Sequence, residues 1–170
     1  GQALKPGQVY DVNSFTLQAV VEAMGGVPVK RGIVGDDVGS IEAALRDASD
    51  YDMGVFSGGS SVGSRDLFGE VVGRLGVIYF HGVKVKPGKP TLFGEVGGTP
   101  IFGMPGYPTS CLNNSYVYLA PALRKMARLP PLEPRKVAAP MGHRLVSRSD
   151  RESFITVRLV EGRAHKVFKQ

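Results

Sequence analysis

Hydrophobic positions along the first half of the chain switch between helical and strand-like spacing. Apolar residues three and four apart predict three helices, over about residues 13–24, 38–48 and 65–75. Short apolar runs predict strands over residues 27–30, 52–57 and 77–80. We expect Asn13 or Ser14 to cap the first helix and Asp37 to cap the second. Alternation of this kind, with short connections, is typical of an α/β fold with parallel strands.

The pattern continues into a hairpin, a long helix and a β-rich end. Two apolar runs, 91–96 and 100–104, flank Gly97-Gly98 and predict a hairpin. A helix should follow over about 109–127, with a kink or break at Pro121. Beyond a proline-rich linker, Pro130-Pro131 and Pro134, three further strands are predicted, at residues 136–139, 144–146 and 154–159. The last part therefore reads as a separate β element.

Composition narrows the class of protein. A chain of 170 residues suffices for one core domain with a small appendage. No apolar run approaches the ~20 residues needed to cross a bilayer, so we expect no membrane partner. The net charge is +6, but the basic residues of the last third alternate with apolar ones and form no nucleic-acid-binding signature. Cys111 is the only cysteine and is expected to be a packed thiol, which favours the cytoplasm.

A glycine- and serine-rich loop follows the predicted strand at 52–57. Its sequence is Ser57-Gly58-Gly59-Ser60-Ser61-Val62-Gly63. Glycines let backbone N–H groups approach a phosphate, and a helix start adds a favourable dipole. Asp66 enters that helix and is a candidate catalytic carboxylate or metal ligand. The alternative is a tight turn with Asp66 as a helix cap.

Two further loops are predicted to meet the first at one sheet edge. Lys86-Pro87-Gly88-Lys89 holds two lysines on a stiff turn, and Met104-Pro105-Gly106-Tyr107-Pro108 forms a rigid rim before the long helix. With Asp36-Asp37, these loops bring carboxylates and ammonium groups to the edge where open α/β sheets bind ligands. A divalent cation and an oligophosphate suit such a set. Two solvated lysines on a type II turn, and aspartates that only cap a helix, are the alternatives.

These motifs together resemble a known family. Pro6-Gly-Gln-Val-Tyr-Asp-Val-Asn13, Asp36-Asp37, the glycine-serine loop with Asp66, Lys86-Pro-Gly-Lys-Pro90 and Pro105-Gly-Tyr-Pro108 occur in order. Over about residues 4–128, the chain looks like the molybdopterin-binding domain of the molybdopterin molybdotransferases, which are related to the C-terminal domain of gephyrin. The resemblance implies a three-layer α/β/α domain with a mostly parallel sheet at residues 1–130. Residues 131–170 would then be the start of a small C-terminal β-barrel domain.

The resemblance also implies an activity and its site. The family inserts molybdate into adenylylated molybdopterin with Mg²⁺ and releases AMP. Catalytic roles would fall to Asp36, Asp66 and Lys86, with Asp36 and Asp66 as metal ligands. The pterin substrate would be bound by the residues of three loops: Ser57, Gly58, Gly59, Ser60, Ser61, Gly63, Lys89, Pro105, Gly106 and Pro108. A homodimer of a longer protein is the expected assembly.

The chain departs from the family pattern at two positions. Tyr107 stands where the family usually has asparagine, and Gly82 where a lysine is common. Both departures favour one alternative function, a cofactor-binding or scaffold module without turnover. A second alternative is the related molybdopterin adenylyltransferase, which shares the domain, although the proline linker and the β tail argue against it.

Overall fold

The computed structural model describes residues 4–6, 8–58, 66–146 and 150–167. Its helical elements are α1 (Asn13–Ala23), α2 (Val38–Asp47), η1 (Ala48–Asp50), α3 (Leu67–Leu75), α4 (Pro108–Asn114), the π-helix η2 (Ser115–Leu119) and α5 (Ala120–Met126). Its strands are β1 (Gly54–Ser57), β2 (Gly76–His81), β3 (Val85–Lys86), β4 (Leu92–Val96), β5 (Thr99–Met104), β6 (Glu152–Ser153), β7 (Val157–Val160) and β8 (Arg163–Lys166).

A four-stranded sheet forms the centre of the molecule, in the order β1-β5-β4-β2. β1 pairs in parallel with β5, whereas β4 runs antiparallel to both β5 and β2. Three of the four strands therefore run in the same direction. The hairpin predicted around Gly97-Gly98 is confirmed as β4–β5, and both glycines have positive φ.

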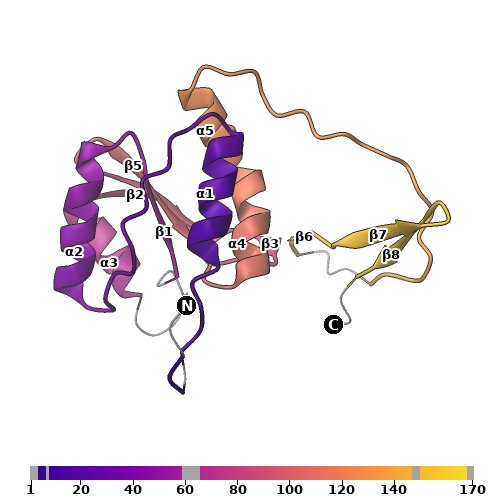
Figure 1. Cartoon of the computed structure of the whole chain (residues 1–170), viewed down its shortest axis with the longest axis horizontal. Helices are drawn as coiled ribbons and strands as arrows, with labels where there is room; N and C mark the ends of the chain where they lie inside the picture. The colour runs from indigo at the N-terminus through magenta and orange to yellow at the C-terminus, as the bar shows by residue number, and fades with distance from the viewer. Residues whose placement is uncertain (1–3, 7, 59–65, 147–149, 168–170) are drawn as a thin grey trace.

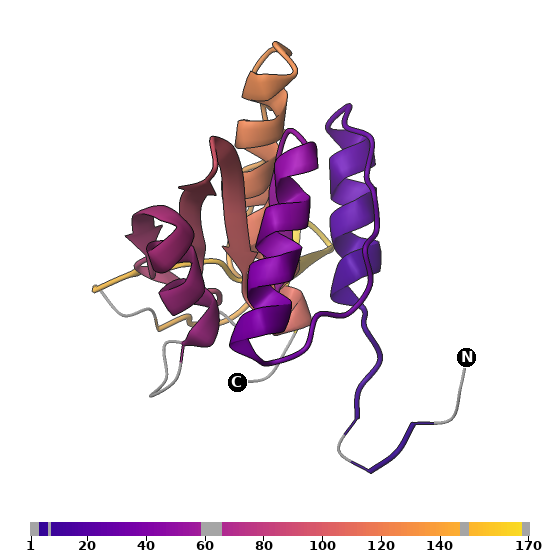
Figure 2. The same ribbon diagram turned by 90° about the vertical axis from the view of Figure 1, so that its left-hand side faces the viewer.

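Helices cover both faces of the sheet, which gives the three layers that the resemblance implies. Figures 1 and 2 show α2 and α3 on one face and α1, α4 and α5 on the other. β5 serves both layers because side chains alternate along a strand. Ile101 packs with α2 and α3, and Phe102 and Met104 pack with α1 and α4 on the opposite face.

Three predicted helices are present, and one predicted cap is wrong. The carboxylate of Asp37 accepts a hydrogen bond from the backbone N–H of Ser40 at 2.8 Å, so it caps α2 as expected. At α1, however, Val12 occupies the cap position, and the N–H of Ser14 donates to Asp11 instead. The side chain of Asn13 is drawn away from the helix start by a contact described below.

The strand predicted at 27–30 is absent. Its sequence pattern is typical of a strand, but the segment pairs with no strand among the described residues. Both of its valines, Val27 and Val29, are exposed, at 89% and 52%. An apolar, β-prone run becomes a strand only where a neighbour offers backbone partners, and periodicity cannot report that neighbour.

The long helix is interrupted as predicted, but the interruption spreads over a full turn. Pro121 lies at the start of α5 and cannot donate a backbone hydrogen bond. The five residues before α5 adopt the wider π conformation, which absorbs the missing donor within an otherwise continuous helix. Cys111, in α4, is fully buried, as predicted for a packed thiol.

The end of the chain is β-rich, but its strands differ from those predicted. No strand forms at 136–139 or 144–146, where Val137 and Val146 are exposed. β7 and β8 make an antiparallel hairpin that overlaps the third predicted strand. β6 pairs in parallel with β3, which ties this end of the chain to the α/β part. Across the described residues, no helix combines the length and apolar character that crossing a membrane requires.

Candidate functional site

The ends of three strands meet at one edge of the sheet. Because β1, β2 and β5 run in the same direction, Ser57, His81 and Met104 all lie at the same end. α1 and α2 also begin at this end (Figure 2), so the Asp36-Asp37 loop reaches it as well. The loops that leave these strands carry most of the candidate site residues, as expected for an open α/β sheet.

The start of the glycine-serine loop lies against the proline-rich rim. Ser57 is in register with Met104, and the N–H of Gly58 donates to the carbonyl of Met104 at 3.2 Å. A Cβ added to Gly106 would lie 3.3 Å from the Cα of Gly58, so the two backbones approach closely. Pro105 is buried beneath them, and Pro108 opens α4 at the surface. Gly59, Ser60, Ser61 and Gly63 lie outside the described residues.

Asn13 fixes this rim from a third element, which the sequence pattern did not indicate. Its side-chain amide donates to the carbonyl of Gly106 at 2.9 Å, across 93 positions of the chain. The side chain is buried, with 7% of the residue exposed. The same residue type at a helix start is usually a local cap, so only the tertiary contact distinguishes the two uses.

Asp66 serves first as the cap of α3, as the alternative interpretation held. One carboxylate oxygen, Oδ1, accepts the N–H of Gly69 at 3.0 Å. The other, Oδ2, lies 2.9 Å from Nε2 of His81, the last residue of β2. Capping and a catalytic role are compatible here because a carboxylate can accept about four hydrogen bonds.

The turn Lys86–Lys89, called the lysine turn below, is held by the buried side-chain amide of Asn114. Asn114, the last residue of α4, donates to the carbonyl of Gly88 at 2.7 Å and to the hydroxyl of Thr91 at 2.6 Å. The Thr91 hydroxyl in turn donates to the same carbonyl at 3.0 Å. Gly88 has φ of +110° and no room for a side chain, because a Cβ would meet the Asn114 amide. This buried polar cluster gives the turn one conformation.

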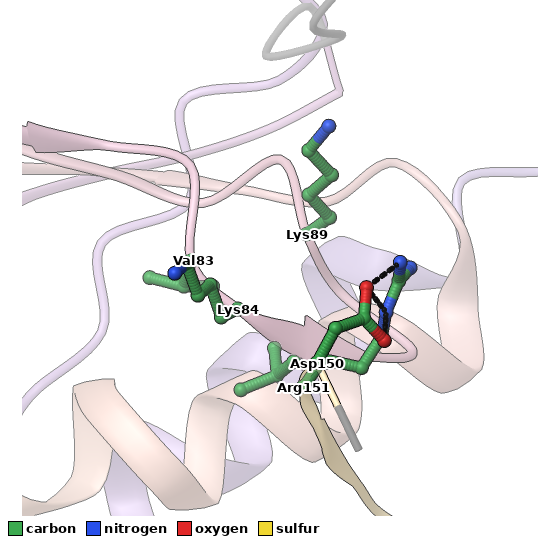
Figure 3. Close-up of a pocket in the computed structure, with 6 residues that line it drawn as sticks. Val83, Lys84, Lys89, Asp150 and Arg151 are labelled. Atoms are coloured by element: carbon green, nitrogen blue, oxygen red, sulfur yellow. Dashed lines mark hydrogen bonds and ion pairs between the residues drawn. The ribbon is translucent and has the colours of Figure 1, made fainter. Parts of the chain in front are cut away.

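A pocket of about 310 Å³ opens beside the lysine turn. Its lining comes from the segment that leads into β3, from Lys89 of the turn and from the residues just before β6: Val83, Lys84, Val85, Lys89, Asp150 and Arg151 (Figure 3). We expected Lys86 and Lys89 to share a cleft, but Lys89 lines this pocket and Lys86 does not. Arg151 is paired with Asp150 at 2.6 Å, and this hydrogen bond raises the pKa of Arg151.

The charged side chains of the pocket are spread rather than convergent. Figure 3 shows Lys84 and Lys89 extending in different directions from the turn, with the Asp150–Arg151 pair beside Lys89. Lys84 and Arg151 were not candidates from the sequence; a cationic residue in the β tail becomes relevant only because β6 pairs with β3. The N–H of Glu152 donates to the carbonyl of Lys84 at 2.9 Å and fixes this proximity.

The backbone conformation at residue 82 gives a physical reason for the glycine that stands where the family commonly has a lysine. Its φ is +89°, a conformation that glycine adopts freely and other residues adopt at a cost. Its N–H donates to the carbonyl of Thr91 at 2.8 Å, which starts the turn. The backbone of a lysine at this position would be strained. Lys84, two residues later, precedes β3 directly and lines the pocket.

Asp36 is the candidate residue with the least support from geometry. It is exposed and, within the described ranges, makes no hydrogen bond with another candidate residue. No group of three or more histidines, cysteines, aspartates and glutamates in the described part of the chain could enclose a metal ion. Mg²⁺ commonly takes only one or two protein carboxylates and completes its shell with water and substrate phosphates. Asp36, whose oxygens accept no hydrogen bond from the residues that the structure describes, and Asp66, with spare lone pairs, fit that donor set.

Comparison with known proteins agrees with this geometry. The family described as "Probable molybdopterin binding domain" matches residues 1–125. The chain is 40% identical over 146 residues to molybdopterin molybdenumtransferase 2 of Mycobacterium tuberculosis, covering 81% of this chain and 36% of that protein. It is 34% identical over 127 residues to the molybdopterin molybdenumtransferase of Haemophilus influenzae, covering 74% of this chain and 31% of that protein.

A solved structure extends the similarity to the β tail. The molybdopterin biosynthesis moea protein of Pyrococcus horikoshii superposes with a TM-score of 0.82 at 36% identity, over 99% of this chain and 41% of that one. The chain thus spans well under half the length of the relatives that it matches. The family match over most of the chain, with the loops gathered at one sheet edge, supports one conclusion: this chain belongs to the molybdopterin-binding domain family.

Proposed function

We propose that this chain is part of an enzyme of molybdenum cofactor biosynthesis that inserts molybdate into adenylylated molybdopterin and releases AMP. The single observation that supports it most is the match of the family to residues 1–125 together with relatives named molybdopterin molybdenumtransferase. We also propose that the molybdopterin-binding domain comprises residues 1–130 and that residues 131–170 begin a second, β-rich domain.

In this proposal the loops at the sheet edge hold an anionic pterin substrate. Backbone N–H groups of the Ser57–Gly63 loop bind its phosphate, and the Pro105–Pro108 rim forms one wall. Lys86 and Lys89 offset the charge of phosphate and molybdate. The buried amide of Asn114 keeps the lysine turn rigid, so little ordering is required when the anion binds.

In this proposal the acidic side chains bind the metal ion. Asp36 and Asp66 would hold Mg²⁺, which when bound neutralises charge on the phosphate oxygens. The chain's own contribution is placement. Asp66 is held by the N–H of Gly69 at Oδ1 and by the contact of His81 with Oδ2, whereas Asp36 is free to turn toward a ligand. Catalysis would then rest mainly on positioning and electrostatics. A homodimer and a cytoplasmic location complete the proposal.

The test is molybdate-dependent release of AMP from adenylylated molybdopterin, measured by chromatography with the protein that contains this chain. Asp66→Ala should lower the rate on the order of 100-fold, as expected for loss of a charge-stabilising group. Asp37→Ala is a matched control because Asp37 caps α2 as Asp66 caps α3. Each variant should lose about 1 kcal/mol of stability from the lost cap, and Asp66→Ala somewhat more because it also loses the contact with His81; only Asp66→Ala should lose activity.

Two outcomes would redirect the assignment. Consumption of ATP with unmodified molybdopterin would support the adenylyltransferase. Tight pterin binding without AMP release would support a binding module. Equal rates for the Asp66 and Asp37 variants would leave Asp66 a helix cap and remove it from the site.

A further inference from the structure

The contact between Asp66 and His81 joins α3 to β2 and is not needed to cap a helix. Asp66 begins α3, and His81 ends β2, the strand that follows α3 directly. Nε2 of His81 lies 2.9 Å from Oδ2 of Asp66, and both side chains are largely shielded, with 15% of Asp66 and 26% of His81 exposed. At this distance the imidazole restrains the carboxylate, the more so because water is partly excluded.

Asp37 shows what capping alone requires. Its second oxygen is satisfied locally by the hydroxyl of Ser40 at 2.6 Å, within the same turn of helix and in full contact with solvent. Asp66 instead takes its second partner from the neighbouring strand. Because the cap bond uses Oδ1 only, the contact at Oδ2 adds nothing to the start of α3. It restricts rotation of the carboxylate.

Gly69 leaves the space that the pair occupies. A Cβ at Gly69 would lie 2.6 Å from Oδ2 of Asp66 and 3.3 Å from Cε1 of His81. The φ of Gly69 is not positive, so no backbone requirement explains a glycine in the first turn of α3. A residue with any side chain at this position would displace the carboxylate oxygen that meets His81.

We propose that His81 is a positioning residue, whose imidazole, in contact with Oδ2, fixes the orientation of the Asp66 carboxylate for the reaction. The inference rests on the proposed function only in giving Asp66 a task beyond capping. With Oδ1 held by the N–H of Gly69 and Oδ2 in contact with the imidazole of His81, the carboxylate has a set orientation. Without His81, the carboxylate can still cap α3 but can exchange its two oxygens by rotation about χ2, which has a broad profile.

Kinetics of two His81 variants test this role. His81→Leu removes the donor, whereas His81→Gln keeps an N–H group on a side chain of similar reach. His81→Leu should lower kcat for AMP release about 10-fold or more with KM for the adenylylated pterin unchanged, because the phosphate cradle is intact. His81→Gln should recover most of that loss. A merely structural role would instead lower stability in both variants and leave kcat per folded molecule unchanged.

Gly69→Ala provides an independent perturbation, because it displaces Oδ2 and deletes no polar group. It should lower kcat in the same way as His81→Leu, and the double variant should lose little more than either single one. Full additivity of the two losses, or wild-type kcat in His81→Leu, would overturn the proposal.

A spectroscopic readout separates this inference from the proposed function. The chain has three histidines, so ¹⁵N-labelled imidazoles are few enough to assign with His81→Gln. The Nε2–H of His81 should be a protected resonance in the wild-type chain and should be lost in Asp66→Ala. If the wild-type protein releases no AMP, the proposed function fails, and a protected Nε2–H still supports the fixed carboxylate. If no such resonance exists, His81 does not hold Asp66, whatever the activity.

Discussion

The α/β body, residues 8–126, and the β tail, residues 127–167, differ in what surrounds their hydrophobic side chains. Among the described residues, the buried hydrophobic core lies in the body except for Ala164. Val157, Leu159 and Val160 in the tail hairpin are exposed. The difference shows that strand-forming sequence alone does not make a core. The body buries its sheet between two helical layers, whereas the hairpin has no second layer among the described residues.

The same difference appears at the candidate site. The body holds Asn13, Asp66 and Asn114 in place through contacts between elements distant in sequence. The tail brings Asp150 and Arg151 to the pocket through the two-residue pairing of β6 with β3. We infer that the body fixes the geometry of the candidate site and that the tail adds the Asp150–Arg151 ion pair at the border of the pocket.

Deleting buried side chains should give the largest contrast between the two regions. Leu45 in α2 is fully buried, and Leu159 in β7 is 53% exposed. Leu45→Ala should cost about 2–5 kcal/mol of unfolding free energy, because a cavity remains in the packed body. Leu159→Ala should cost less than about 0.5 kcal/mol. Urea denaturation of the chain measures both, and comparable losses would mean that the hairpin packs as tightly as the body.

Two glycines with positive φ sharpen the comparison at the level of the backbone. Gly88 has φ of +110° against the Asn114 amide, and Gly162 has φ of +73° in the tail hairpin with no atom near its missing Cβ. Gly162→Ala should cost about 1 kcal/mol from backbone strain alone. Gly88→Ala should cost about 3 kcal/mol, because the buried hydrogen bonds of Asn114 are also disturbed.

Activity gives the Gly88 prediction a second measurement. The displaced lysine turn should raise KM for the pterin substrate in Gly88→Ala, whereas Gly162→Ala should leave it unchanged. Thermal unfolding of the two variants side by side supplies the stability values. If both cost the same, Asn114 yields easily and does not hold the turn.

Elements with local partners could be predicted from the sequence, whereas elements with distant partners could not. Periodicity predicted the helices and the β4–β5 hairpin because those elements satisfy their own hydrogen bonds or pair with a neighbour in sequence. It failed at 27–30, 136–139 and 144–146, where a strand would need a distant partner that no local pattern announces. Parallel pairing between β6 and β3 was equally invisible, so Arg151 was not a candidate.

Site residues divide in the same way. Ser57, Lys89 and Pro105 were predicted from turn chemistry and the order of motifs, and the structure places all three at or beside one sheet edge. His81 and Asn114 could not be predicted, because each looks like an ordinary residue of a strand or helix. Their contacts with candidate site residues join positions that lie 15 to 26 residues apart in the chain.

The thiol of Cys111 probes the interior of the body through pH. Burial raises its pKa from the ordinary value near 9 to about 11. Its contribution to stability is complete below pH 9, because the thiol is then protonated in both states. Between pH 9 and 11 the unfolded thiol ionises and the folded one does not, so about 2–3 kcal/mol should be lost. Cys111→Ala should lack this component, and denaturation across that range measures the difference.

Reaction of the thiol with a disulfide reagent at pH 8 provides the control. The thiolate fraction of native Cys111 should be about a hundredfold lower than that of an unfolded thiol, and the higher nucleophilicity of the thiolate offsets only about tenfold of this, so native Cys111 should react at least about tenfold more slowly. Rapid modification of the native chain would mean that the body opens at α4 under these conditions and is less tightly packed than the comparison with the tail implies.

Substitution of Tyr107 should have the smallest effect on stability, because this residue belongs to the body but its side chain packs little against it. Its side chain is 75% exposed, and it occupies the cap position of α4 without a side-chain hydrogen bond to the helix. Asparagine is among the best capping residues, so Tyr107→Asn should change stability by less than about 0.5 kcal/mol, toward greater stability. Calorimetry of the chain measures this. A loss above about 1 kcal/mol would show that the ring stabilises the rim, whereas unchanged stability with altered KM would place the ring against the substrate.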